Sequence, residues 1–139
     1  MRYIIAIVLF VFSTSIYSQE KCLLIDSVKV KFVSWDIVTD VSLGCANFES
    51  SIDYQVCSEK NSHLIHKLIK ELDRLGTSEG RGEDIRCKLE FYHLGQICRL
   101  DCVGNLLTTK ESGYYYTSKK LKSIINRIIN KNRKRIRIE

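Results

Sequence analysis

The histidines are the side chains with which this sequence could bind a metal. His63 and His66 are three residues apart, and Glu59 lies one helical turn earlier. Two histidines on one helical face can hold a metal ion, but no third ligand is fixed by spacing and no H-E-x-x-H motif is present. We therefore interpret both histidines as surface residues and predict no metal site.

Catalytic motifs are also missing from the sequence. It contains no G-x-S-x-G elbow, no P-loop and no glycine-rich dinucleotide turn. Asp84 precedes a predicted strand and Asp101 falls on the wet face of a predicted hairpin, so both are expected to be solvated carboxylates. The sequence thus predicts a protein that is not an enzyme and has no cofactor. The alternative is a small exported hydrolase whose acid–base pair converges only in the folded chain.

The first residues resemble a secretory signal peptide. A positive start at Arg2 precedes an unbroken apolar run over 4–12, and Ser13, Thr14 and Ser15 follow before Ile16-Tyr17-Ser18. We expect cleavage after Ser18, with Ser15 or Gln19 as alternative positions. The protein is therefore predicted to be exported, to the periplasm or beyond the cell.

Six cysteines remain after this cleavage, and an even number in a short exported chain is typical of a disulfide framework. Many pairings are possible, but strand alternation favours one of them. If Leu94 and Gly95 form a hairpin turn, Cys87 lies opposite Cys102. We predict a Cys87–Cys102 bridge, and then Cys45–Cys57 and Cys22–Cys98.

The positive charge is concentrated at the C-terminal end. The formal net charge is +6, and residues 118–139 contain nine lysines and arginines against one glutamate. Such a segment can attract phosphates, anionic lipid head groups or an acidic partner, although a solvated terminus is the favoured interpretation. No helix-turn-helix, zinc-finger spacing or basic–aromatic platform is present, so nucleic acid is not the expected partner.

Three consecutive tyrosines at 114–116 are the most unusual run in the sequence. Alternation along a strand places Tyr115 on one face and its two neighbours on the other, where they could either cover the core or form an interface. The candidate partner-binding residues are Tyr114, Tyr116, Lys119, Lys131, Arg133, Lys134, Arg135 and Arg137. They predict a binding or inhibitory module for an unknown protein or anionic surface. The alternative is a peripheral envelope protein that uses its basic C-terminal helix.

Hydrophobic periodicity predicts the elements that must position these side chains. Alternating apolar residues indicate strands over 24–34, 51–57, 84–92 and 96–103, and shorter ones over 106–109 and 114–117. Apolar stripes of helical spacing indicate amphipathic helices over 59–75 and 119–131.

The length of 139 residues and the absence of a linker indicate one domain. We expect a signal peptide over 1–18, a single α+β domain over 19–131 and a basic C-terminal tail over 132–139. The expected fold is a mostly antiparallel sheet of five to six strands, in the order β-β-α-β-β-β-β-α. Both amphipathic helices are expected on one face of this sheet, and disulfides are expected to staple the domain.

Overall fold

The computed structural model of the protein describes residues 24–139. The expected leader and Cys22, and with it the predicted Cys22–Cys98 bridge, lie outside the described residues. The described chain forms one small α+β domain built on a single antiparallel sheet, which confirms the predicted fold class.

The sheet has seven strands in the order β6-β5-β4-β3-β1-β2-β7. This is more than the five to six expected, and one of the additional pairings comes from two residues of the expected basic tail. The strands are β1 (Ser27–Phe32), β2 (Gln55–Lys60), β3 (Ile85–His93), β4 (Gln96–Gly104), β5 (Leu107–Lys110), β6 (Gly113–Tyr116) and β7 (Arg137–Ile138).

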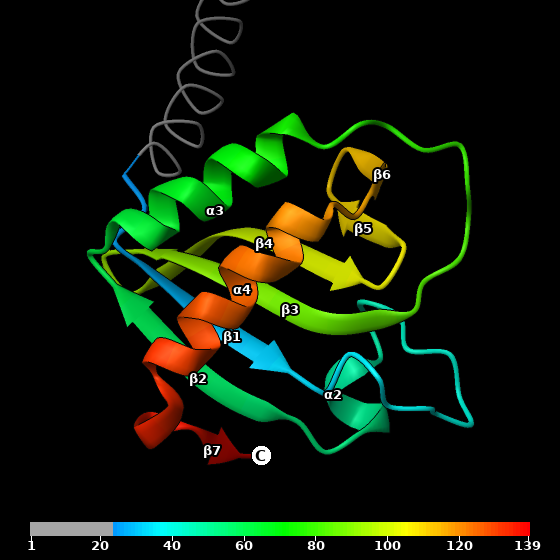
Figure 1. The fold of residues 1–139 in the computed structure, drawn as a ribbon, viewed down its shortest axis with the longest axis horizontal. Coiled ribbons are helices and arrows are strands. Elements are labelled where there is room, and N and C mark those ends of the chain that lie inside the picture. Colours follow the sequence, from blue (N-terminus) through cyan, green and yellow to red (C-terminus); the bar gives the residue numbers. More distant parts are fainter. Residues whose placement is uncertain (1–23) are drawn as a thin grey trace, which may run out of the picture.

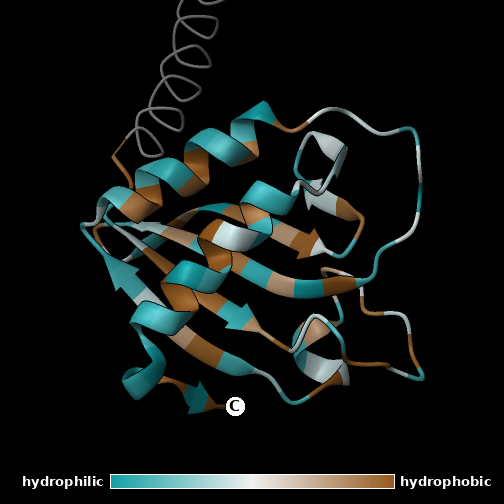
Figure 2. Ribbon diagram, in the orientation of Figure 1, coloured by the Kyte–Doolittle hydropathy of each residue, from teal (hydrophilic) through white to brown (hydrophobic). Residues whose placement is uncertain are grey.

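Two long helices cross the same face of this sheet, as predicted (Figure 1). They are α3 (His63–Arg74) and α4 (Lys119–Lys131); a short helix α2 (Phe48–Ser51) and a 3-10 turn η1 (Arg133–Arg135) complete the fold. Both long helices alternate apolar and polar stretches along their length (Figure 2). We call the face under α3 and α4 the helix face, and the opposite one the outer face.

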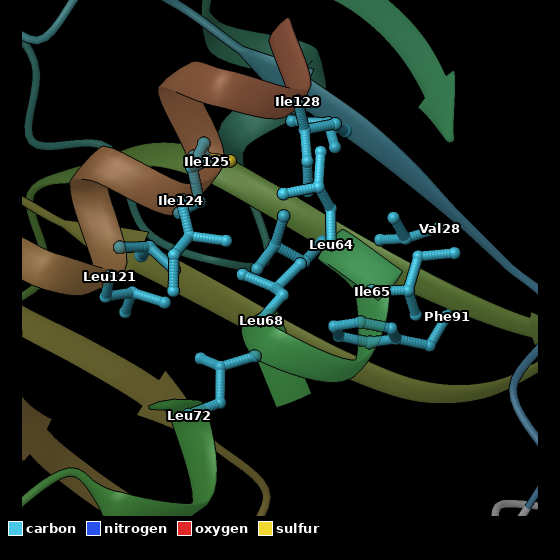
Figure 3. Packing of buried hydrophobic residues seen from close by; sticks show 14 of the residues in the cluster. Val28, Leu64, Ile65, Leu68, Leu72, Phe91, Leu121, Ile124, Ile125 and Ile128 are labelled. Atoms are coloured by element: carbon cyan, nitrogen blue, oxygen red, sulfur yellow. The ribbon is translucent and has the colours of Figure 1, made fainter. Parts of the chain in front are cut away.

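The main core lies between these two helices and the sheet. Figure 3 shows side chains of α3 and α4 converging over Val28 and Phe91 of the sheet. Leu68, Leu121 and Ile125 are fully buried there. Burying each such side chain contributes on the order of 1.5–3 kcal/mol, so this cluster is the main source of the fold's stability.

Helix α4 matches its predicted range, whereas β2 and α3 both begin later in the chain than predicted. Helix α4 spans the predicted residues, and its cap is Ser118, whose Oγ accepts the N–H of Leu121 at 3.0 Å. Strand β2 begins at Gln55 rather than at residue 51, because 48–51 form a helical turn that buries Phe48. Helix α3 consequently starts only at His63, after a turn at Asn61 with a positive φ of 45°.

The outer face carries a second, smaller core. Its buried members are Val33, Leu43, Phe48, Ile85 and Cys102, which come from the strands and from the loop 33–47 with α2. We call this loop and helix, residues 33–51, the cover. The cover is fastened to β4 by a disulfide between Cys45 and Cys102, whose Cα atoms are 5.7 Å apart.

The β3–β4 hairpin explains where the sequence reading failed. Its turn lies at Leu94 and Gly95, as predicted, and both have positive φ. Tyr92 accordingly lies opposite Ile97, but its neighbour Phe91 lies opposite Arg99. Strand β4 therefore contains one extra residue, Cys98, between these two pairs. This β-bulge shifts the register of the next residues by one and moves their side chains to the other face.

The predicted Cys87–Cys102 bridge is wrong for this reason, and the predicted Cys45–Cys57 bridge is wrong because its two cysteines lie on opposite faces of the sheet. After the bulge Cys102 lies opposite Lys88, on the outer face, whereas Cys87 belongs to the core under the helices. Cys57 also belongs to that core. Cys45, in the cover, therefore meets Cys102, and the two thiols of Cys57 and Cys87 stay buried on the opposite side of the sheet.

We predict that these two thiols are unreactive in the folded protein. Burial raises the pKa of Cys57 to about 11 and raises that of Cys87 as well, so neither forms the nucleophilic thiolate at neutral pH. Alkylation followed by peptide mapping should label both cysteines only after unfolding. Proteolysis without reductant should release the Cys45 and Cys102 peptides as one linked pair; a Cys87–Cys102 peptide would contradict the assigned faces.

Candidate binding surface

An ionic network holds the cover against the outer face. The Lys31 Nζ contacts one carboxylate oxygen of Glu49 and one of Glu90, each at 2.6 Å, and Lys88 reaches Glu49 at 3.0 Å. Tyr92 donates its hydroxyl to Glu90 at 2.8 Å. Burial, together with this hydrogen bond, raises the pKa of Tyr92 to about 12. The phenol therefore stays protonated and anchored at the border of the covered area.

Beyond this network, part of the outer face is not covered by any helix among residues 24–139. The bulge leaves Ile97, before it, and Leu100, after it, on this same face, where they are 55% and 39% exposed. Lys29 lies on β1, and its Nζ is 5.5 Å from the centroid of the Tyr92 ring. We call this region the open patch; by register it consists of Lys29, Tyr92, Ile97, Leu100, Thr109, Tyr114 and Tyr116.

The tyrosine run adds to this patch as alternation predicts. Tyr114 lies opposite Thr109, which in turn lies opposite the outer-face Cys102, and Tyr116 shares that face and is 60% exposed. Tyr115 lies opposite Thr108, which is buried on the other side. The Lys110 Nζ is 3.8 Å from the centroid of the Tyr115 ring, so this tyrosine contributes to packing rather than to the patch.

The same bulge buries a carboxylate that the sequence suggested was solvated. Asp101 is only 2% exposed and accepts a hydrogen bond from Arg99 Nε at 2.8 Å. The Arg99 Nη1 reaches Asp73 of α3 at 2.9 Å. Burial raises the pKa of Asp101 despite the guanidinium beside it. Because one arginine binds both carboxylates, this cluster ties α3 to β4 beside a shallow pocket of about 410 Å³.

The predicted partner-binding residues are not brought to one place. Lys119 begins α4 and Lys131 ends it, so at about 1.5 Å per residue they lie roughly 18 Å apart. Lys131 contacts Glu59, a carboxylate that is only 4% exposed and also accepts a hydrogen bond from Asn132 at 2.6 Å. Burial opposes the ionisation of Glu59, but these two donors outweigh it and lower its pKa.

The remainder of the basic tail folds back onto the sheet. Arg133, Lys134 and Arg135 form the turn η1, and Arg137 in β7 lies opposite Val56 of β2. Tyr116 and the tail residues therefore belong to different parts of the molecule, separated by the width of the sheet.

The two histidines considered as metal ligands lie on the surface of the domain. His63 and His66 are exposed on α3, and the nearby Glu59 is occupied by Lys131. Within residues 24–139 no three metal-ligating side chains converge. No helix in this same stretch has the length and apolar character that crossing a bilayer requires.

Comparisons of the chain with family models, with curated proteins and with solved structures find no match. The interpretation of the open patch therefore rests on its geometry.

Sequence reasoning identified Tyr114 and Tyr116 but missed five residues of the patch, namely Lys29, Tyr92, Ile97, Leu100 and Thr109. The alternation that contains Leu100 is visible in the sequence, but the bulge assigns it to the face opposite to the one expected. The useful signal in the sequence is the pair of opposite charges at Arg99 and Asp101, on either side of Leu100. Opposite charges two residues apart lie on one face of a strand, where they can pair and be buried together.

We predict that the stability cost of Glu59→Gln depends on pH. Because the pKa of Glu59 is lower in the folded state, its carboxylate stabilises the protein at pH values above its ordinary pKa of 4.5. This contribution disappears as the pH falls through the lowered pKa. Urea unfolding should show a cost of about 1–3 kcal/mol near pH 7 and a much smaller cost near pH 2. Glu79→Gln, at an exposed loop position, is the control; an equal cost of Glu59→Gln at both pH values would contradict the assignment.

Proposed function

We propose that this protein is an exported, non-catalytic binding module that docks a folded protein partner on its open patch. The observation that carries the proposal is the combination of exposed apolar and aromatic side chains on one face of the sheet. Exposed tyrosines supply large contact areas with little loss of conformational entropy, and apolar side chains beside them are typical of the centre of an interface. An inhibitory role is one form of this function, in which the partner is an enzyme.

The rigidity of the patch supports docking of a preformed surface. It lies on three central and two edge-side strands rather than on loops, and the Tyr92 hydroxyl is held by Glu90. The Cys45–Cys102 bridge fastens the cover at its border. A rigid surface loses little entropy on binding, so its contacts translate efficiently into affinity.

The charge at the border of the patch indicates the kind of partner. Lys29 lies over Tyr92, and Lys60 is exposed on the neighbouring edge of the outer face, while the acidic Glu90 is buried. A positive rim around an apolar centre is complementary to a protein surface whose apolar centre is surrounded by carboxylates.

Export is part of the proposal and is supported by the disulfide. Cysteine pairs of this kind form and persist in oxidising compartments, whereas cytosolic thiols are kept reduced. The Cys45–Cys102 bridge closes a long segment of chain, of sequence separation 57, and fits a protein that matures outside the cytosol.

The test compares two variants with the same chemical change. Leu100→Glu places a charge in the open patch, and Leu106→Glu places one at a more exposed apolar residue in the β4–β5 turn. Proteins captured by the oxidised wild type from its native extracellular milieu are identified by mass spectrometry, and the affinity of the purified partner is then measured by calorimetry. We expect Leu100→Glu to weaken binding about tenfold or more and Leu106→Glu to leave it within about twofold.

Salt gives a second readout for the same complex. Raising the sodium chloride concentration from about 0.05 M to about 0.5 M should weaken binding, because the exposed lysines at the rim are screened. Equal binding by wild type and Leu100→Glu would refute the patch as the docking surface. Turnover of a captured molecule by the protein would favour the hydrolase alternative.

A further inference from the structure

A basic pocket lies at the opposite edge of the sheet from the tyrosine strand. It has a volume of about 380 Å³ and is bounded by the outer edge of β2, the end of α4, η1 and β7. Four cationic side chains line it, one from each of these elements: Lys60, Lys131, Arg135 and Arg137. The pocket shares no residue with the open patch itself, and of its cations only Lys60 also belongs to the positive rim described above.

The fold holds these cations in place by bending the tail back. The backbone of Tyr54 and Glu139 exchange two hydrogen bonds, of 3.1 and 2.9 Å, which pair β7 with the first residues of β2. Asn132 ends α4 and binds the buried Glu59 and the carbonyl of Ile128, at 2.6 and 2.9 Å. The basic tail is therefore attached at both ends, and its arginines are presented toward a common hollow.

The edge of β2 adds backbone donors to the pocket. Strand β7 pairs only with Gln55 and Val56, so the outer edge of β2 from residue 57 to 60 has no strand partner among residues 24–139. Since Tyr54 directs both its N–H and its C=O to this edge, alternation along the strand directs the N–H and C=O groups of Ser58 and Lys60 to it as well.

The one buried carboxylate in the pocket does not cancel its charge. Glu59 is already bound by Lys131 and Asn132, and four cations against one carboxylate leave a net charge of +3. Lys131 is itself 54% exposed and retains further N–H groups for a second acceptor.

We propose that this pocket binds a phosphate or sulfate group carried by a small molecule or by a lipid or glycan headgroup. Guanidinium forks match the oxygens of a tetrahedral anion, and cations that converge from several directions favour such an anion over a planar carboxylate. An extended acidic peptide is less well suited, because β7 occupies the continuation of the edge and leaves only residues 57–60 open.

The experiment uses the purified oxidised chain and two matched double variants. Arg135→Gln/Arg137→Gln removes two charges that line the pocket, and Arg133→Gln/Lys134→Gln removes two from the same tail that do not line it. Inorganic phosphate, inorganic sulfate and an acidic peptide are titrated by NMR. We expect wild type to bind phosphate or sulfate with a Kd of about 1 mM or below, and more tightly than the peptide.

The pocket variant should weaken this binding about tenfold or more, and the control variant by less than about threefold. Circular dichroism and thermal unfolding check that both variants fold like wild type; if the pocket pair perturbs folding, Lys60→Gln is measured in its place. Equal loss in both double variants, no binding of either free anions or phosphatidic acid vesicles, or tighter binding of the peptide would each overturn the proposal.

Vesicles separate the two sources of the anion. Phosphatidic acid vesicles present a phosphate monoester and phosphatidylserine vesicles of equal charge density present a phosphodiester with a carboxylate. Selective binding to phosphatidic acid that is lost in the pocket variant indicates a headgroup ligand, while binding of free phosphate alone indicates a soluble one; both support the pocket. The proposal would be overturned if both kinds of vesicle bind equally and if the pocket variant and the control variant lose this binding to the same extent.

Discussion

The extra residue near Cys98 in β4 determines which face of the sheet each following side chain of that strand occupies. It directs Asp101 and Val103 toward the helices, and Leu100 and Cys102 toward the outer face. The disulfide to the cover, the ion pairs of Arg99 and the exposed apolar centre of the open patch all depend on this one shift. A hairpin without the bulge would direct Leu100 to the helix face and Asp101 to the outer face, and Cys102 and Val103 would exchange cores.

Two different layers protect the two faces. The helix face is sealed by α3 and α4, which lie across the sheet (Figure 1) and pack apolar side chains against β1, β3 and β4. The outer face is sealed only in part, by a short helix and a loop that contribute few apolar side chains. Such a thin cover buries too little apolar surface to be held by packing alone, and the disulfide and the Lys31–Glu49–Lys88 network compensate for this.

The two edges of the sheet are protected from pairing with other chains in different ways. At one edge the loop after α3 pairs with β6, since Tyr116 donates to the carbonyl of Gly76 and Ser78 donates to that of Tyr114. At the other edge β7 protects only the first residues of β2, and a concentration of positive charge surrounds the rest. Exposed strand edges invite pairing with other chains, and charge is a common defence against it. The same arrangement is what allows the basic pocket to receive an anion.

The sequence by itself determined the elements whose pattern is local. The α4 range, the Leu94–Gly95 turn, the alternation of the tyrosines and the α+β class follow from side-chain periodicity and turn chemistry, which act over a few residues. It also indicated that cysteine bridges would staple the domain. The pairing was decided only in three dimensions, because a single inserted residue has no signature in composition yet reverses the direction of every side chain that follows. The burial of Asp101, the return of the basic tail to β2 and the open patch likewise depend on contacts between residues far apart in the chain, and these exist only once the sheet has formed.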